Sequence, residues 1–311
     1  MKNHLLLLGI DNYTKHLKLN SCVKDCKDIR DILVDKYGFL TDNLNELFDG
    51  DATNLRIQEK FREYIKSLTD VDNLVIYYSG HGGYDKTSEK GYWIPYDSDP
   101  SNFTTWIAND IILSYIKQIK AKHIFLISDS CFSRSILITE PTKSIISDDK
   151  DYDFYPSRWG LTSGAEECID GEPGANTYFG EVILNILKTN NNDLRVSSLI
   201  DKVKKQFESN RFQKPQGYPL NDPKHRGGEL IFKVSTDLNG ESESLKGYKD
   251  FLTILKFYKR NANFKEVDRY ENKSLKIGYQ IYITNACVYT QTHKNPVRHS
   301  SAFRARSTIV Y

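Results

Sequence analysis

A pair of short apolar segments constrains the fold of this sequence most. Each segment leads directly into a residue with a reactive side chain. Leu74 to Tyr78 is an unbroken apolar run that leads into Ser-Gly-His-Gly-Gly, which contains His81. Ile124 to Ile127 is a second such run and leads into Ser-Asp-Ser-Cys, which ends at Cys131. Short unbroken runs are typical of strands buried on both faces. Open α/β sheets place ligand sites at the carboxyl ends of their strands, so we expect this thiol and this imidazole to meet there as nucleophile and base.

The surrounding pattern alternates strands with amphipathic helices. This alternation predicts an α/β fold with a mostly parallel sheet and helices on both faces. The expected strands are 5–10, 44–48, 74–78, 124–127, a restart of the sheet at 159–163 and a closing strand at 229–234. The expected helices are 23–37 with Gly38 as C-cap, a helix with Thr53 as N-cap, 109–119, 178–187 and 196–207.

We predict one domain over residues 1–235 and a separate region over 240–311. Within the domain, residues 143–158 are acidic, aromatic and unpatterned, which favours an exposed loop. From Gly240 onward, 13 Lys and Arg stand against 6 Asp and Glu, so this region is basic, and its fold and role are left unassigned. A solvated surface is the simplest interpretation of that charge, and recruitment of an acidic partner is the alternative.

Composition narrows the class of protein. The formal net charge of +2 gives no global basic field, so a nucleic-acid partner is not expected. The five cysteines are odd in number and lack framework spacing, which favours a reducing compartment. The early apolar run at 5–10 is too short to span a membrane, and no cleavage-site pattern follows it. We therefore expect a cytoplasmic protein without a transmembrane segment.

A cysteine attacks a carbonyl group as thiolate, so it needs a neighbouring proton acceptor, and His81 can supply one. The oxyanion that forms needs fixed donors, which backbone N–H groups beside the nucleophile and in a glycine turn can provide. Gly82 lets the backbone approach a substrate closely, because it has no Cβ.

Tyr-Tyr-Ser-Gly-His-Gly-Gly at 77–83, followed fifty residues later by Asp-Ser-Cys-Phe-Ser at 129–133, resembles the caspase and metacaspase family of cysteine peptidases. The spacing between His and Cys is a known feature of caspases. The likeness runs from Leu5 to about Val234. It implies a three-layer sandwich with a six-stranded, mostly parallel sheet, His81 as general base, Cys131 as nucleophile, and the amides of Gly82 and Cys131 as oxyanion hole.

The resemblance also predicts which bond is cut. Two residues before the nucleophile the chain has Asp129, as in metacaspases, where caspases that cut after aspartate have glutamine. Ser21 to Cys26 is similar to the metacaspase stretch whose aspartate, here Asp25, lines the same pocket. Two carboxylates can bind a guanidinium through charge-assisted hydrogen bonds. We expect cleavage of protein or peptide substrates after Arg or Lys, with Ser79 as a further pocket residue.

Further expectations follow from the resemblance. Lys143, Lys150 and Arg158 are candidate self-cleavage points, although an active intact chain is equally compatible. No cofactor is expected to be required. Calcium activates some family members, and its weak candidate ligands here are Asp97, Asp99 and Asp110, which lack the spacing of a dedicated calcium loop. The chain also departs from the usual metacaspase His-Ser-Gly after the cysteine, because it has Phe132-Ser133-Arg134 there. A part in bacterial stress or antiphage cell death is the suggested setting, and an activating partner and the oligomeric state are left open.

Other interpretations of the same residues compete with catalysis. A lone buried thiol is more often inert than nucleophilic, and Asp25 at a helix start is by default a solvated carboxylate. Cys22 and Cys26 have the spacing of one helical turn, but no further pair completes a zinc site. Two other classes of protein fit the same fold: a catalytically silent caspase-like scaffold and a cysteine hydrolase acting on a non-peptide amide or ester.

Overall fold

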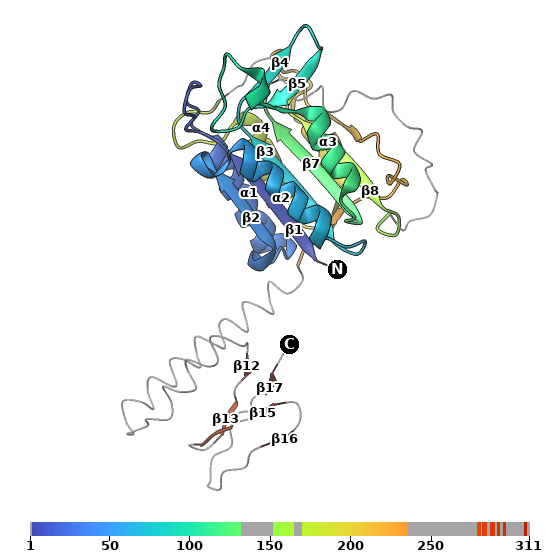
Figure 1. Ribbon diagram of the computed structural model, residues 1–311. Coiled ribbons are helices and arrows are strands. Elements are labelled where there is room, and N and C mark those ends of the chain that lie inside the picture. The colour runs from blue at the N-terminus through green and yellow to red at the C-terminus, as the bar shows by residue number, and fades with distance from the viewer. Residues whose placement is uncertain are drawn as a thin grey trace. The chain divides into compact units, whose positions relative to one another are not determined.

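The computed structural model describes residues 2–131, 152–164 and 170–235, and six short strands between residues 279 and 309 (Figure 1). The chain divides into two compact units, residues 1–236 and 237–311. In the second unit the described strands form three antiparallel pairs, β12 with β17, β13 with β14 and β15 with β16. Their bounds are β12 Tyr279–Gln280, β13 Tyr282–Thr284, β14 Cys287–Tyr289, β15 Gln291–Thr292, β16 Asn295–Pro296 and β17 Thr308–Ile309.

A six-stranded sheet with the order β10-β8-β7-β3-β1-β2 organises the first unit. Its strands are β1 Asn3–Gly9, β2 Leu44–Phe48, β3 Asn73–Ser79, β7 His123–Asp129, β8 Ser157–Thr162 and β10 Gln216–Pro219. All neighbouring pairs are parallel except β10 with β8. The expected α/β class with a six-stranded, mostly parallel sheet is therefore confirmed.

Within the described ranges of the first unit, five α-helices flank the two faces of this sheet (Figure 1). Their bounds are α1 Cys22–Tyr37, α2 Asn54–Ser67, α3 Asn109–Gln118, α4 Tyr178–Thr189 and α5 Val196–Gln206, with short 3₁₀ turns at Thr41–Asn43, Asp49–Asp51 and Phe103–Thr105. Two predicted caps are confirmed. The hydroxyl of Thr53 accepts the N–H of Arg56 at 3.3 Å, and Gly38 has the left-handed φ of 67° that ends α1.

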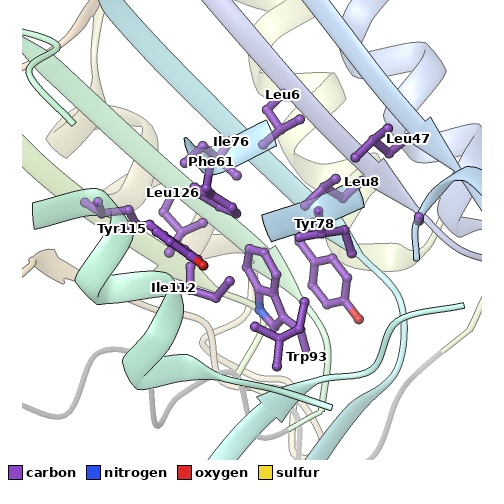
Figure 2. Close-up of a cluster of buried hydrophobic side chains, with 14 of the residues drawn as sticks. Leu6, Leu8, Leu47, Phe61, Ile76, Tyr78, Trp93, Ile112, Tyr115 and Leu126 are labelled. Atoms are coloured by element: carbon purple, nitrogen blue, oxygen red, sulfur yellow. The ribbon is translucent and has the colours of Figure 1, made fainter. Parts of the chain in front are cut away.

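Alternating side chains of each central strand separate the two layers of core. Leu6 and Leu8 of β1 pack with Phe61 of α2 and with α3 on one face, where Trp93 stacks on Tyr78 with ring centroids 4.2 Å apart (Figure 2). Leu5 and Leu7 pack with α1, α4 and α5 on the other face. Since β1, β3 and β7 are buried on both faces, the apolar runs that predicted them are explained.

The predicted closing strand at 229–234 is wrong as a member of the central sheet. Only Ile231–Phe232 is extended there (β11), and it pairs with β9, Leu194–Arg195, in a separate two-stranded sheet. The sixth strand is β10, whose sequence Gln-Gly-Tyr-Pro has little strand propensity. It pairs at the sheet edge, where a proline is tolerated.

A small antiparallel sheet lies beyond the carboxyl end of β3. It has the order β4-β5-β6, with bounds Gly82–Asp85, Lys90–Trp93 and Ile107–Ala108. β3 ends two residues before His81 and β4 begins immediately after it, so this histidine lies in a two-residue connection between strands. No helix in the described part of the chain is long and apolar enough to cross a membrane.

Candidate active site

The two central strands β3 and β7 bring His81 and Cys131 to the same edge of the sheet. They pair in parallel, with Ser79 opposite Asp129, and each reactive residue lies two positions beyond that pair. The pairing continues past the strand ends, because the N–H of Gly80 donates to the carbonyl of Asp129 at 3.2 Å. Cys131 is 8% exposed, and its thiol is not in a disulfide.

Gly82 packs directly against the backbone of Cys131. A Cβ at Gly82 would overlap the Cys131 carbonyl oxygen and would lie 3.1 Å from the Cys131 nitrogen. Only glycine fits without moving one of the two loops, so the glycine after the histidine is required by the close approach of these segments. His81 and Cys131 thus belong to chain segments that are in contact.

Two tyrosines hold the backbone of His81. Its N–H donates to Oη of Tyr13 at 2.7 Å, and its carbonyl accepts from Oη of Tyr78 at 2.6 Å. Both tyrosines are buried, and the Tyr13 ring lies 4.8 Å from the imidazole, centroid to centroid. Because both peptide groups of His81 are bonded to core side chains, the position of the histidine is fixed by the core.

A backbone carbonyl orients the imidazole ring. Nε2 of His81 lies 2.8 Å from the carbonyl oxygen of Leu17. A carbonyl can only accept, so Nε2 carries the hydrogen and Nδ1 carries the free lone pair. Burial lowers the pKa of His81 from its usual value, and the bond to Leu17 opposes this shift. The neutral tautomer with Nδ1 as base is therefore favoured at neutral pH.

The loop that supplies Leu17 is anchored on both sides. Asp11 accepts the N–H of Cys22 at 2.7 Å, which ties the loop to the start of α1. Lys15 pairs with Asp99 at 2.6 Å. Sequence reasoning did not assign Tyr13 or Leu17 to the site. A contact made by a backbone carbonyl does not depend on the type of residue, so the sequence gives no sign of it. The only available signal was the polar turn at 11–13 after the first strand.

The two aspartates expected in the pocket are brought together by a third residue, Thr177. Its hydroxyl oxygen lies 2.7 Å from Oδ2 of Asp25 and 2.7 Å from Oδ2 of Asp129. Asn176 also donates to Oδ1 of Asp25 at 2.8 Å. Asp25 is fully buried and Asp129 is 8% exposed. Ser79 is fully buried as well, beside the Cys22 thiol, and it is paired with Asp129 across β3 and β7.

Burial dominates the electrostatics of this pair. Burial and, after it, the charge of Asp129 raise the pKa of Asp25 to about 8, while hydrogen bonds from Thr177 and Asn176 oppose the shift. Burial also raises the pKa of Asp129 to about 6, against the hydrogen bond from Thr177. The carboxyl group that ionises more readily is thus the one nearer to solvent.

The candidate calcium ligands do not converge. Asp99 pairs with Lys15 and Asp110 with Lys90, while Asp97 accepts the N–H of Asn54 at 2.9 Å. Within the described ranges no three His, Cys, Asp or Glu side chains are grouped so that they could hold a metal ion.

One predicted self-cleavage point is wrong. Arg158 lies in β8 and is 1% exposed, so a protease cannot reach its peptide bond in the folded chain. The expected loop at 143–158 therefore ends before Ser157. Arg158 is held inside by its ion pair with Asp222 at 3.5 Å and by the carbonyl of Ile119. Lys143 and Lys150 lie outside the described residues.

Comparison with known proteins agrees with this geometry. A family model described as the caspase domain matches residues 2–222. Metacaspase-4 of Arabidopsis thaliana is 26% identical over 191 residues, which cover 55% of this chain and 44% of the relative. For Metacaspase-6 of the same plant the identity is 26% over 225 residues, with 66% and 53% covered. Metacaspase-1A of Neurospora crassa is 30% identical over 147 residues, with 42% and 32% covered.

A solved structure shares the fold. The protein GSU0716 from Geobacter sulfurreducens aligns with a TM-score of 0.53 and 18% identity, over 74% of this chain and 100% of that one. Because the caspase-domain match covers well over half of the residues, the chain belongs to the caspase-domain family of cysteine-type peptidases. It spans about half the length of the two Arabidopsis relatives.

Proposed function

We propose that this protein is a cysteine endopeptidase that cleaves after arginine or lysine, with Cys131 as nucleophile and His81 as general base. The observation that supports the proposal is the close approach of the segments that follow β3 and β7. In this arrangement Nε2 of the His81 imidazole is hydrogen-bonded to the carbonyl of Leu17. That bond leaves Nδ1 as the ring nitrogen available for the thiol proton.

In the proposed reaction the thiol of Cys131 passes its proton to His81. Its sulfur attacks the carbonyl carbon of the Arg or Lys residue that precedes the scissile bond. The backbone amides of Gly82 and Cys131 stabilise the oxyanion. The imidazolium then protonates the leaving amine, and a thioester remains on the enzyme. Water hydrolyses this thioester after His81 has taken one of its protons, which restores the free thiol.

We assign recognition of the basic side chain to the carboxyl groups of Asp129 and Asp25. Asp129 lies two residues before the nucleophile and is the more accessible of the two. A guanidinium or ammonium group that reached it would gain a charge-assisted hydrogen bond in a largely desolvated setting. An acidic side chain would instead meet like charge, so peptides ending in aspartate should not be cut.

Hydrolysis of fluorogenic peptides ending in Arg, Lys or Asp by the full chain tests this proposal. Cys131→Ala and His81→Ala should each abolish turnover of the Arg and Lys peptides, while the wild type leaves the Asp peptide intact. Cys26→Ala is the matched control, because it removes a buried thiol from α1 outside the proposed machinery. If Cys131→Ala kept its turnover, or if the Asp peptide were the better substrate, the proposal would fail. Correct folding without turnover on any substrate would favour the scaffold interpretation.

Self-cleavage is a second part of the proposal and concerns Lys143 and Lys150. Both are basic and lie between β7 and β8, the strands that flank residues 132–151. The double variant Lys143→Ala/Lys150→Ala should remain intact during incubation under conditions in which the wild type is cut, as followed by intact-mass measurement. Persistent cleavage at another residue would exclude these two points.

A further inference from the structure

The hydroxyl of Thr177 has more close partners than its own hydrogen can serve. Thr177 is the N-cap of α4, and its Oγ1 accepts the N–H of Gly180 at 2.9 Å. The same oxygen lies 2.7 Å from one carboxyl oxygen of Asp25 and 2.7 Å from one of Asp129. A hydroxyl group has one hydrogen to donate and two lone pairs that accept.

Counting hydrogens therefore places an additional proton at this point. Gly180 uses one lone pair of the hydroxyl, and its single hydrogen can be given to only one carboxylate. The remaining contact of 2.7 Å would bring two acceptors together without a hydrogen between them, unless that carboxyl group is itself protonated. The geometry thus requires one protonated carboxyl group next to Thr177.

Burial identifies the protonated partner as Asp25. It is fully buried, while Asp129 reaches the surface with 8% of its area. A buried carboxylate is costly unless a positive charge compensates it, and a neutral carboxylic acid avoids this cost. Among the residues that the structure describes, no Lys, Arg or His forms an ion pair with either carboxyl group.

The titratable groups that face Asp25 and Asp129 from the neighbouring elements also favour a neutral Asp25. Those nearby are acidic or can only become negative: Asp28, Cys22 and Cys26 on α1, Asp11 before α1, Tyr77 on β3 and Asp170 before α4. On α1, Lys24 is engaged by Asp28 at 2.5 Å. A second negative charge at Asp25 would add to this field, so a neutral Asp25 is favoured.

We propose that Thr177 joins Asp25 and Asp129 into one unit that holds a single proton when no substrate is bound, with Asp25 as the protonated member and Asp129 as the carboxylate that meets the cation of the substrate. This inference rests on the proposed function. Asp25 donates to Thr177, and Thr177 donates to Asp129. Asp25 and Thr177 are therefore positioning residues, and the pocket presents one negative charge.

Isosteric substitutions distinguish a pair of carboxyl groups that carries one negative charge from a pair that carries two. Asp25→Asn is uncharged and can still donate to Thr177, so it should lower kcat/KM for an Arg peptide at neutral pH much less than Asp129→Asn does. Asp129→Asn removes the charge that binds the substrate and should lower kcat/KM by about 30-fold or more, mainly through KM. Thr177→Ser keeps the bridging hydroxyl and should behave like the wild type. Thr177→Val lacks the hydroxyl and should raise KM. Urea unfolding of each variant checks that it is folded.

The pH profile gives a readout that a purely structural role would not move. The ratio of kcat/KM between the wild type and Asp25→Asn cancels the titration of His81 and Cys131, which both enzymes share. It should be constant well below pH 8 and rise above about pH 8, where Asp25 loses its proton and adds a second attractive charge. A flat ratio over the whole range would overturn the assignment of the proton to Asp25.

Infrared spectroscopy tests the proton without reference to activity. The folded full chain at neutral pH should show the carbonyl band of a protonated buried carboxyl group, and Asp25→Asn should lack it. The inference is wrong if this band does not depend on Asp25, or if Asp25→Asn costs as much as Asp129→Asn. If the band is present but Arg and Lys peptides are not cleaved, the shared proton is supported and the proposed function fails.

Discussion

Replacing Tyr13 by phenylalanine tests how firmly the backbone of the proposed base is held. Oη of Tyr13 accepts the N–H of His81 at 2.7 Å, and the tyrosine is 7% exposed. The substitution keeps the ring that packs 4.8 Å from the imidazole and removes the hydroxyl, which also contacts Tyr78. A buried N–H left without a partner costs about 1–3 kcal/mol, which we expect as the loss in the free energy of unfolding. If His81 shifts by about 1 Å to recover a partner, the rate falls by about 100-fold.

Two measurements on the same protein separate these effects. Urea unfolding gives the free energy, and steady-state hydrolysis of an Arg peptide gives kcat and KM, of which kcat should fall and KM should change little. Tyr64→Phe is the matched control, because its hydroxyl accepts from Asn45 at 2.8 Å on α2, outside the site. The control should lose stability and keep its kcat. If Tyr13→Phe were destabilised by the expected amount but kept its kcat within about twofold, the backbone anchor would not matter for catalysis.

Three further predictions follow from single contacts. Gly82→Ala should abolish turnover, because its Cβ would overlap the backbone of the nucleophile, and hydrolysis of an Arg peptide by the folded variant checks this. Burial lowers the pKa of His123 to about 4, whereas the ordinary value in the unfolded chain is 6.5, so the unfolded chain binds the proton more readily. The stability that His123 contributes is therefore complete above pH 6.5. It is lost as the pH falls towards 4, by up to about 3 kcal/mol. Comparing the pH dependence of urea unfolding with that of His123→Asn isolates this contribution, and equal slopes would contradict it. Asp222→Ala should destabilise the protein by about 3–5 kcal/mol in urea unfolding, because it leaves Arg158 buried and unpaired, whereas Asp51→Ala, which breaks an exposed pair, should stay within about 1 kcal/mol.

Local patterns predicted most of the elements. The runs at 74–78 and 124–127 are explained by strands with both faces in the core, and Thr53 and Gly38 are the caps that local rules expect. The edge strand at 216–219 escaped prediction, since its pairing with β8 depends on a partner distant in the sequence. Arg158 was misplaced because a charged residue next to an acidic segment has the pattern of a loop, while its buried partner Asp222 lies 64 positions away.

The sequence by itself determined that Cys131 and His81 lie close together, because a thiol and an imidazole that each follow a fully buried strand come to the same edge of a parallel sheet. It also singled out Gly82, but for its approach to a substrate, whereas the structure requires glycine there because of the backbone of Cys131. Only the tertiary structure decided what surrounds them: the carbonyl of Leu17 on the imidazole, the two tyrosines on the backbone of His81, and Thr177 between Asp25 and Asp129. These contacts join segments as far as 152 residues apart through backbone atoms and side-chain hydrogen bonds, which local sequence patterns do not encode.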